Sequence, residues 1–220
     1  MLTVAKMATF PGRADIAPKA FESIHKQVDL VTVYCNGYEK IPEFLVRKPN
    51  VQTIFGKDLG DGGKIFGSLG DYTFLVDDDI IYPPDYVARM IEEIDKDPTK
   101  VYGCHAAIMK NPVKNYFKDR EVLHFRSPLS LSRRVNVLGT GTVAFKSGAV
   151  YPAQIKPEHP NMLDCYFAEH CQRNQIGMVS IQRPNNWLKS LPTETSLWQQ
   201  RGNGELQTQV MQKIPHWSVY

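Results

Sequence analysis

The stretch at residues 72–86, YTFLVDDDIIYPPDY, decides the fold of this chain. Its first five residues are apolar, aromatic or β-branched, which is typical of a fully buried strand. Asp77, Asp78 and Asp79 follow, and two prolines at 83 and 84 then prevent regular structure from continuing. A helix is expected from Asp85, because apolar residues recur at helical spacing beyond it. The sequence therefore predicts a buried strand that ends in a turn of carboxylates.

Three adjacent carboxylates repel one another, so their position at the end of a core strand requires a reason. A divalent cation supplies one. In a turn, Asp77 and Asp79 can converge while Asp78 points elsewhere, and Mg²⁺ or Mn²⁺ binds a few such oxygens while keeping positions for phosphate oxygens. The alternative is a solvated acidic turn that caps the next helix. The strand before the acids and the segments described below favour the metal site.

Composition excludes several classes of protein. Among 220 residues, 42% are hydrophobic and 22% are charged, which is ordinary for a globular chain with one sizeable core. The net charge of +3 gives no argument for nucleic acid. No apolar run approaches the ~20 residues that span a bilayer and no signal-peptide pattern opens the chain, so we expect a cytoplasmic protein. The cysteines form no CxxC pair and are expected as free thiols: Cys35, Cys104, Cys165 and Cys171.

Strands alternate with helices in the first half. Residues 2–7, 29–34 and 51–55 have strand composition and precede the strand at 72–76, and Ala17, Ala20, Phe21 and Ile24 mark a helix face between the first two. This alternation predicts βαβ units, an α/β fold and a mostly parallel central sheet. In such sheets ligands bind outside the carboxyl ends of the strands.

Polar side chains follow these strands. The first strand leads to Thr9 and Arg13, the second to Asn36, and the third to a glycine-rich loop with Asp58 and Lys64. An amide suits a base edge, a lysine suits a phosphate, and a metal can bridge two phosphates. Each residue alone also has a structural explanation, as a turn or a flexible loop. Because all of them lie at one edge of one sheet, together they predict a pocket for a nucleoside diphosphate.

The order of these segments resembles the GT-A fold of bacterial family 2 glycosyltransferases, many of which act in capsule or lipopolysaccharide assembly. The resemblance covers the first half well and the second half loosely. Its motifs are the loop Ala8-Thr9-Phe10-Pro11-Gly12-Arg13, the strand ending in Asn36-Gly37, the Asp58 to Lys64 loop, and the three aspartates before a Tyr-Pro-Pro-Asp-Tyr helix start. It implies a Rossmann-like central sheet flanked by helices, in one domain with a nucleotide-binding half (1–107) and a less regular acceptor-binding half (108–220).

The resemblance also implies an activity. It is metal-dependent, inverting transfer of a sugar from a nucleotide-diphosphate sugar to a saccharide or lipid-linked saccharide acceptor. Asp79 would be the usual metal ligand of a DxD motif, with Asp77 beside it and Mn²⁺ or Mg²⁺ as the cofactor. The resemblance favours a UDP-sugar as the donor, although many members read uracil with an aspartate at the position where this chain has Asn36. The expected nucleotide contacts are Ala8, Thr9, Phe10, Arg13, Asn36, Asp58, Lys64, Asp77 and Asp78.

The second half is less regular. Residues 101–107 have strand composition, and residues 108–134 carry basic side chains among aromatic ones. We expect a surface loop there first, a flap over the donor diphosphate or an anionic acceptor second, and a contact with single-stranded nucleic acid third. No RRM or OB signature accompanies the charges, so no nucleic-acid partner is expected.

Glycines interrupt the β-branched residues at 135–146, VNVLGTGTVAFK. This pattern predicts two strands separated by a glycine kink where another group approaches closely, or else a plain hairpin. In the resembling family this segment lines the donor-sugar and acceptor site, which makes Thr140 and Gly141 candidates for that pocket.

Asp164 is the candidate catalytic base. Apolar residues recur at helical spacing from Leu163, which places Asp164 in the first turn of a helix, where an acid satisfies open backbone donors and the helix dipole. The resembling family keeps its base at this place. The dipole is expected to keep Asp164 ionised, ready to take a proton from a sugar hydroxyl. Glu169 is the reserve candidate.

Several late residues have open alternatives. His216 is either a candidate third metal ligand or an ordinary surface residue. The first alternative comes from the resemblance, because some resembling enzymes complete the metal shell with a late histidine. His105 is expected in the core with a hydrogen-bond partner. A patch of Trp187, Trp198 and Trp217 suits peripheral membrane association. The chain is short for a complete enzyme of this type, so two alternatives stay open: it pairs with another subunit, or it is one module of a larger capsule-synthesising assembly. The non-enzymatic alternative is a degenerate transferase fold that binds sugar nucleotides or serves in assembly.

Overall fold

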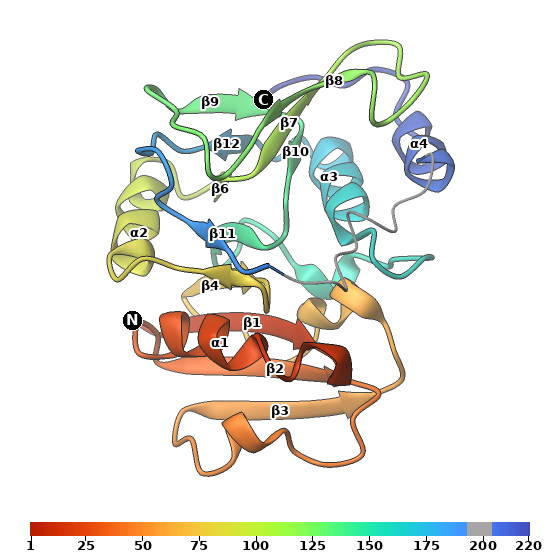
Figure 1. Ribbon diagram of the computed structural model, residues 1–220. Helices are drawn as coiled ribbons and strands as arrows, with labels where there is room; N and C mark the ends of the chain where they lie inside the picture. Colours follow the sequence, from red (N-terminus) through yellow and green to blue (C-terminus); the bar gives the residue numbers. More distant parts are fainter. Residues whose placement is uncertain (193–203) are drawn as a thin grey trace.

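The computed structural model describes residues 1–192 and 204–220. Within them, an eight-stranded sheet has the strand order β3-β2-β1-β4-β11-β6-β12-β9 (Figure 1). Its strands are β1 (Thr3–Thr9), β2 (Leu30–Asn36), β3 (Val51–Gly56), β4 (Tyr72–Val76), β6 (Val101–Gly103), β9 (Arg133–Val135), β11 (Thr142–Lys146) and β12 (Met178–Ser180). The sheet includes strands from both halves of the chain.

Most strands of this sheet run in one direction. β1 pairs in parallel with β2 and β4, β2 with β3, and β6 with β12, whereas β11 is antiparallel to both β4 and β6, and β9 is antiparallel to β12. Only β11 and β9 therefore run against the others among the described strands. The α/β class and the mostly parallel sheet are confirmed.

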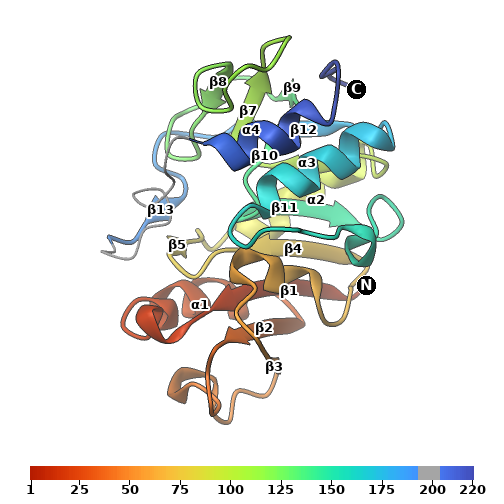
Figure 2. The same ribbon diagram turned by 90° about the vertical axis from the view of Figure 1, so that its right-hand side faces the viewer.

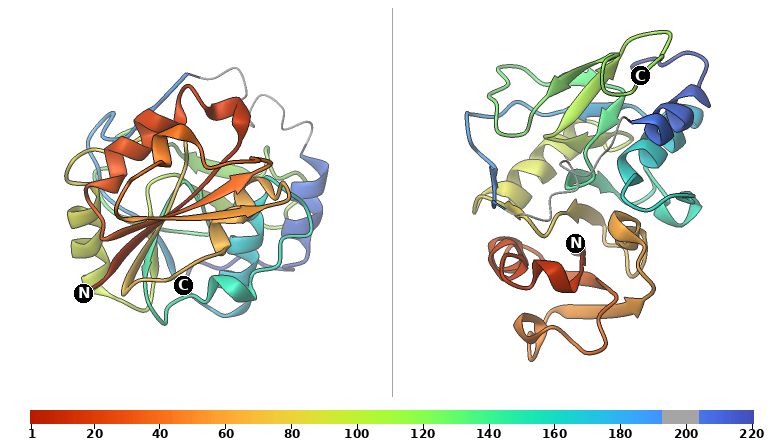
Figure 3. Two further views of the ribbon diagram at one scale, coloured as in Figure 1. Left: turned by 90° about the horizontal axis from the view of Figure 1, so that it is seen from below. Right: turned by 45° about the vertical axis from the view of Figure 1, so that its right-hand side comes forward.

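Helices cover both faces of the sheet. α1 (Ala17–His25) and α2 (Tyr86–Lys96) pack on one face, and α3 (Leu163–Arg173) and α4 (Glu205–Gln212) on the other (Figure 3, right). β4 contributes to both layers, because Phe74 belongs to the core under α1 and α2 and Leu75 to the core under α3. Each of these side chains is fully buried and stabilises the fold by about 2 kcal/mol relative to exposure.

The strand predicted at 101–107 is divided. β6 ends at Gly103, and β7 (Ala106–Met109) joins a separate sheet with the order β10-β7-β8, where β8 is Arg120–Leu123 and β10 is Val137–Leu138. Between them, the backbone N–H groups of Cys104 and His105 both donate to the hydroxyl of Thr142, at 3.1 and 2.9 Å. A side chain thus takes the donors that a continuing strand would pair, and the chain turns away.

One expectation and one open alternative for the second half are wrong. Residues 120–123 form a strand rather than a loop, because β8 pairs antiparallel with β7. Residues 135–146 do not form a plain hairpin, because β10 pairs with β7 whereas β11 pairs with β4 and β6. The chain therefore passes from one sheet to the other through residues 139–141, as the prediction of two strands around a glycine kink required.

The remaining elements are short. They are the strand pair β5 (Ile80–Ile81) and β13 (Lys189–Ser190), and the 3-10 helices η1 (Pro11–Arg13), η2 (Glu43–Leu45), η3 (Gly60–Ile65) and η4 (Pro152–Gln154). Figure 2 shows η3 beside the ends of β1 and β2, below α3. All four cysteines are free and buried, as expected.

The expected tryptophan patch does not form as predicted. Trp217 is 3% exposed, and its indole N–H donates to the carbonyl of Met211 over 3.0 Å, so it belongs to the core. Trp198 lies outside the described residues. Within the described ranges, no helix has the length and apolarity that crossing a membrane requires. Cytoplasmic location and peripheral association stay predictions.

Candidate active site

A cavity of about 530 Å³ lies beyond the carboxyl ends of β1, β2 and β4. Of the nine residues predicted to contact nucleotide, eight line it, and Thr9 is the exception. Asp79, Thr140, Gly141 and Asp164 line it as well. The structure therefore brings together residues from strand ends and from a helix that are up to 156 positions apart in the sequence, Ala8 and Asp164 being the extremes.

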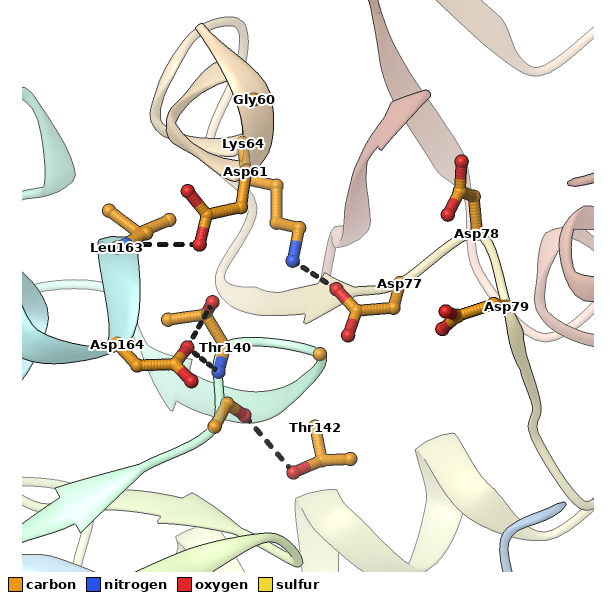
Figure 4. A network of polar contacts seen from close by, with 12 residues as sticks. Gly60, Asp61, Lys64, Asp77, Asp78, Asp79, Thr140, Thr142, Leu163 and Asp164 are labelled. Carbon is orange, nitrogen blue, oxygen red and sulfur yellow. Dashed lines mark hydrogen bonds and ion pairs between the residues drawn. The ribbon is translucent and has the colours of Figure 1, made fainter. Parts of the chain in front are cut away.

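The three aspartates after β4 point in different directions. Asp77 extends toward Lys64, Asp79 extends in the direction of Asp77, and Asp78 points away from both (Figure 4). The guanidinium of Arg13 lies 3.0 Å from Asp79 Oδ2 and 3.9 Å from Asp78 Oδ1. Burial raises the pKa of Asp78 to about 7, although Arg13 opposes the shift. Burial and the neighbouring Asp77 also raise the pKa of Asp79.

Two carboxylates, Asp77 and Asp79, fit a divalent cation that is bound together with a diphosphate. Mg²⁺ and Mn²⁺ prefer oxygen ligands, and Mg²⁺ in phosphate sites is usually held by one or two carboxylates, with phosphate and water completing the shell. Among residues 1–192 and 204–220, no group of three His, Cys, Asp or Glu side chains forms a complete protein site. His216 is exposed near the C-terminus and is not among the described residues that line the cavity, so the structure does not bring it to the aspartates.

Asp77 and Asp79 form the acidic wall of the cavity, and Lys64 lies against it. It is 3% exposed, and its ammonium donates to Asp77 Oδ1. Burial alone would lower its pKa, but the carboxylates of Asp77 and Asp61 raise it, so the ammonium stays charged. The lysine side chain therefore lies at the predicted edge of the sheet, and its partner in the structure is a carboxylate.

Asn36 supports the loop that carries Lys64. It is 2% exposed, its Nδ2 donates to the carbonyl of Gly60 over 3.1 Å, and its Oδ1 accepts from the backbone N–H of Leu59 over 2.9 Å. Asp58 closes the same turn by accepting from Gly60 N over 2.8 Å. The contact of Asn36 with a base edge stays a prediction, and these bonds give its amide a structural role that the sequence analysis did not foresee.

The loop after β1 forms another part of the cavity lining. The guanidinium of Arg13 lies 5.7 Å from the centre of the Phe10 ring. The carbonyl of Phe10 accepts from the hydroxyl of Tyr38 over 2.9 Å, which fixes the start of η1. Phe10 and Arg13 line the cavity, whereas Thr9 is buried at the end of β1.

The close approach predicted at the glycine kink is that of Asp77. A Cβ atom on Gly141 would lie 2.0 Å from Asp77 Oδ2, so only glycine leaves room for this carboxylate. The hydroxyl of Tyr82 joins the same two residues, because it donates to the carbonyl of Gly141 over 2.6 Å and accepts from Asp77 N over 2.7 Å. The sequence analysis missed Tyr82, whose only signal is its position five residues after Asp77.

Asp164 faces the acidic wall from the first turn of α3 (Figure 4). Its Oδ1 accepts from both the backbone N–H and the hydroxyl of Thr140, each over 2.7 Å. Burial raises the pKa of Asp164, and the two bonds from Thr140 oppose the shift. The expected place on the helix is confirmed, but the helix dipole does not hold the pKa low as expected. Glu169 pairs with Arg173 at 2.9 Å and is not among the described lining residues.

An aromatic wall completes the cavity on the side of the second half. It consists of Tyr116, Phe117, Phe125 and His105, with Arg120 stacked on the first two rings. Of the three expectations for residues 108–134, the flap is the one that this placement favours, and what it contacts stays a prediction. Burial and the neighbouring His124 lower the pKa of His105 to about 3, so its ring is neutral. Its Nδ1 has no hydrogen-bond partner in the described part of the chain, which differs from the expected core histidine.

Comparison with known proteins gives a family match for part of the chain and similar solved structures for most of it. Residues 67–151 match the model of glycosyl transferase family 2, and no curated protein sequence matches the chain. The solved structures that are similar to it include GalNAc-T7 with UDP, GalNAc and Mn²⁺, at a TM-score of 0.62 and 9% identity over 88% of this chain and 44% of that one. They also include S. aureus TarS 1–349 in complex with UDP-GlcNAc, at a TM-score of 0.58 and 12% identity over 89% and 60%.

These matches confirm the expected resemblance. At such identities the similar structures establish the fold, which is GT-A, and the family match covers the strand with the aspartates through β11. The chain therefore has a GT-A fold, and its residues 67–151 match glycosyl transferase family 2. It spans 44% and 60% of the length of the two similar chains.

Proposed function

We propose that this protein transfers a sugar from a UDP-sugar to a hydroxyl group of a saccharide or lipid-linked saccharide, with inversion, in surface polysaccharide synthesis. One observation carries the proposal. A single cavity has Asp77 and Asp79 on one wall and, across from them, Asp164 held by Thr140 (Figure 4). The resemblance to family 2 supports the acceptor class and the inversion.

The donor side suits a diphosphate. Arg13 and Lys64 are cations at the strand ends, and both already lie against carboxylates of the motif. Asp77 and Asp79 would hold Mn²⁺ or Mg²⁺, which supplies Lewis-acid stabilisation of the charge that develops on the departing diphosphate. The two similar structures contain UDP with Mn²⁺ and UDP-GlcNAc, which supports a uridine donor here.

Asp164 has the properties of a general base. Its carboxylate lines the cavity, and the two bonds from Thr140 fix one oxygen and leave the other to accept a proton from an acceptor hydroxyl. A carboxylate whose pKa is raised by burial is a better base near neutral pH than an exposed one. Because Asp164 and the aspartate motif lie on opposite walls, the hydroxyl would attack the anomeric carbon opposite to the departing diphosphate, which inverts that centre.

The test is UDP release from a panel of UDP-sugars with saccharide and lipid-linked acceptors, in wild type, Asp164→Asn and Glu169→Gln. Asp164→Asn should abolish transfer while UDP still binds, because the amide keeps the shape of the carboxylate and cannot take the proton. Glu169→Gln, on the same helix and outside the cavity lining, is the matched control and should keep near-wild-type turnover. If Asp164→Asn retains near-full turnover, Asp164 is not the base. UDP binding without any turnover in wild type would favour the degenerate sugar-nucleotide-binding module instead.

A further inference from the structure

The side chain of Asp61 joins two elements that are far apart in the sequence. Its Oδ2 accepts a hydrogen bond from the backbone N–H of Leu163 over 3.0 Å, across 102 positions. Leu163 is the first residue of α3, and the N-cap residue, Met162, makes no side-chain capping bond among the described residues. Helix N-termini leave backbone donors that a capping side chain normally satisfies. Asp61 therefore caps α3 from a different part of the chain.

The loop that carries Asp61 directs two charged side chains to different parts of the cavity. From η3, Lys64 extends to Asp77, whereas Asp61 extends to Leu163, the neighbour of Asp164 (Figure 4). Asn36 holds the start of this loop through the backbone of residues 59 and 60. A single short element thus connects the wall that would receive the diphosphate with the helix that carries the candidate base.

A charged side chain is an expensive cap at this position. Burial, together with the neighbouring Asp164 and Asp77, raises the pKa of Asp61 to about 7, although Lys64 and the bond from Leu163 oppose the shift. The Oδ1 atom is buried and has no hydrogen-bond partner within the described residues. An asparagine would accept the same bond from Leu163 without placing a further negative charge beside two others.

We infer that Asp61 is a positioning residue for sugar transfer: its hydrogen bond to Leu163 fixes the start of α3, and with it the Asp164 carboxylate, relative to the loop that carries Lys64. The inference rests on the proposed function, because it requires Asp164 to be the base. Displacing a catalytic group by about 1 Å costs on the order of 100-fold in rate. Loss of this bond should therefore reduce turnover without weakening the donor site.

The experiment compares Asp61→Ala, which removes the acceptor, with Asp61→Asn, which keeps it. Two quantities are measured: hydrogen exchange of the backbone amides at 163–166, which needs no substrate, and kcat and KM for the UDP-sugar. Asp61→Ala should speed exchange and lower kcat by about 10-fold or more, with KM changed less than about 2-fold. Asp61→Asn should restore both readouts. Asp61→Leu, which has a similar shape and no acceptor, replaces the alanine variant if that variant does not fold.

Asp29→Ala is the matched control. The carboxylate of Asp29 also accepts a backbone N–H, from Thr3 over 2.8 Å, but it lies at the start of β1 and outside the described lining of the cavity. Its removal should leave kcat and the exchange of α3 unchanged. The inference is overturned if Asp61→Ala leaves either exchange or kcat at the wild-type value, or if Asp61→Asn is as impaired as Asp61→Ala. Those results with an active wild type refute only this inference, whereas a wild type that transfers no sugar refutes the proposed function as well.

Discussion

Replacing Asp61 by asparagine should stabilise the protein, and the gain should grow with pH. The folded state raises the pKa of Asp61 from 3.8 to about 7, mainly through burial. The folded state therefore binds the proton more tightly than the unfolded chain does. The stability that goes with this proton is fully present below pH 3.8 and is lost as the pH rises through about 7. Asparagine cannot ionise, so the variant escapes this loss.

The magnitude follows from the two pKa values. Between pH 5 and pH 6 the unfolded chain has lost the proton and the folded protein has kept it, so each pH unit costs about 1.4 kcal/mol of stability. The slope falls as the folded carboxyl ionises near pH 7, so from pH 5 to pH 7 the advantage of Asp61→Asn should grow by about 2 kcal/mol and then level off. The bond to Leu163 persists because the asparagine carbonyl can accept it, so the pH-dependent part is electrostatic.

The assay is urea unfolding of wild type and Asp61→Asn at pH 5, 6, 7 and 8. Asp78, whose pKa is also raised to about 7, contributes equally to both proteins and cancels in the difference. Asp97→Asn is the control with the opposite sign, because hydrogen bonds from Lys100 and Thr99 lower the pKa of Asp97 to about 2 and removing the charge should destabilise the protein at neutral pH. A stability difference for Asp61→Asn that is the same at pH 5 and pH 8 would refute the reasoning.

Two predictions concern the walls of the cavity. Thr140→Ala removes the hydroxyl bond that stabilises ionised Asp164, so the pKa of Asp164 should rise. Activity is lost at low pH because this base is protonated there. In the variant this loss should therefore occur about 1 to 2 pH units higher than in wild type. An unchanged acid limb in the pH profile of kcat/KM would count against this pairing. Gly141→Ala places a Cβ 2.0 Å from Asp77 Oδ2 and should weaken UDP binding by about 10-fold or more, as one displaced charged contact costs about 1.4 kcal/mol or more. In Gly62→Ala the nearest atom is 3.7 Å away, so this control should bind normally, and equal titration curves for the two variants would contradict the steric argument.

The first half of the fold was predictable because its signals are local. The strands and the aspartate turn follow from runs of residues that determine their own conformation, and parallel strands necessarily bring their carboxyl ends to one edge. Asp164 could also be placed, since the period of apolar residues locates the first turn of its helix.

The rest of the site depends on contacts between distant residues. Asp61 meets Leu163 across 102 positions, and Tyr82 meets Gly141 across 59, and neither pair leaves a pattern in one sequence. The strand at 101–107 was divided by the hydroxyl of Thr142, which takes two backbone donors about 40 residues earlier in the chain. Asn36 was assigned to a base because its bonds to residues 59 and 60 are equally invisible before folding.

The most direct test of the central claim is a thermal-shift titration with UDP, GDP, ADP and CDP, each with and without Mn²⁺, in wild type and Asp79→Ala. A nucleotide at 100 times its dissociation constant adds about 2.7 kcal/mol to the native state, which raises Tm by roughly 5 to 10 °C for a chain of this size. The account predicts that UDP with Mn²⁺ gives this shift and that Asp79→Ala loses it. Stabilisation by none of the four nucleotides, or an undiminished shift in Asp79→Ala, would contradict a metal-assisted UDP site at the end of β4.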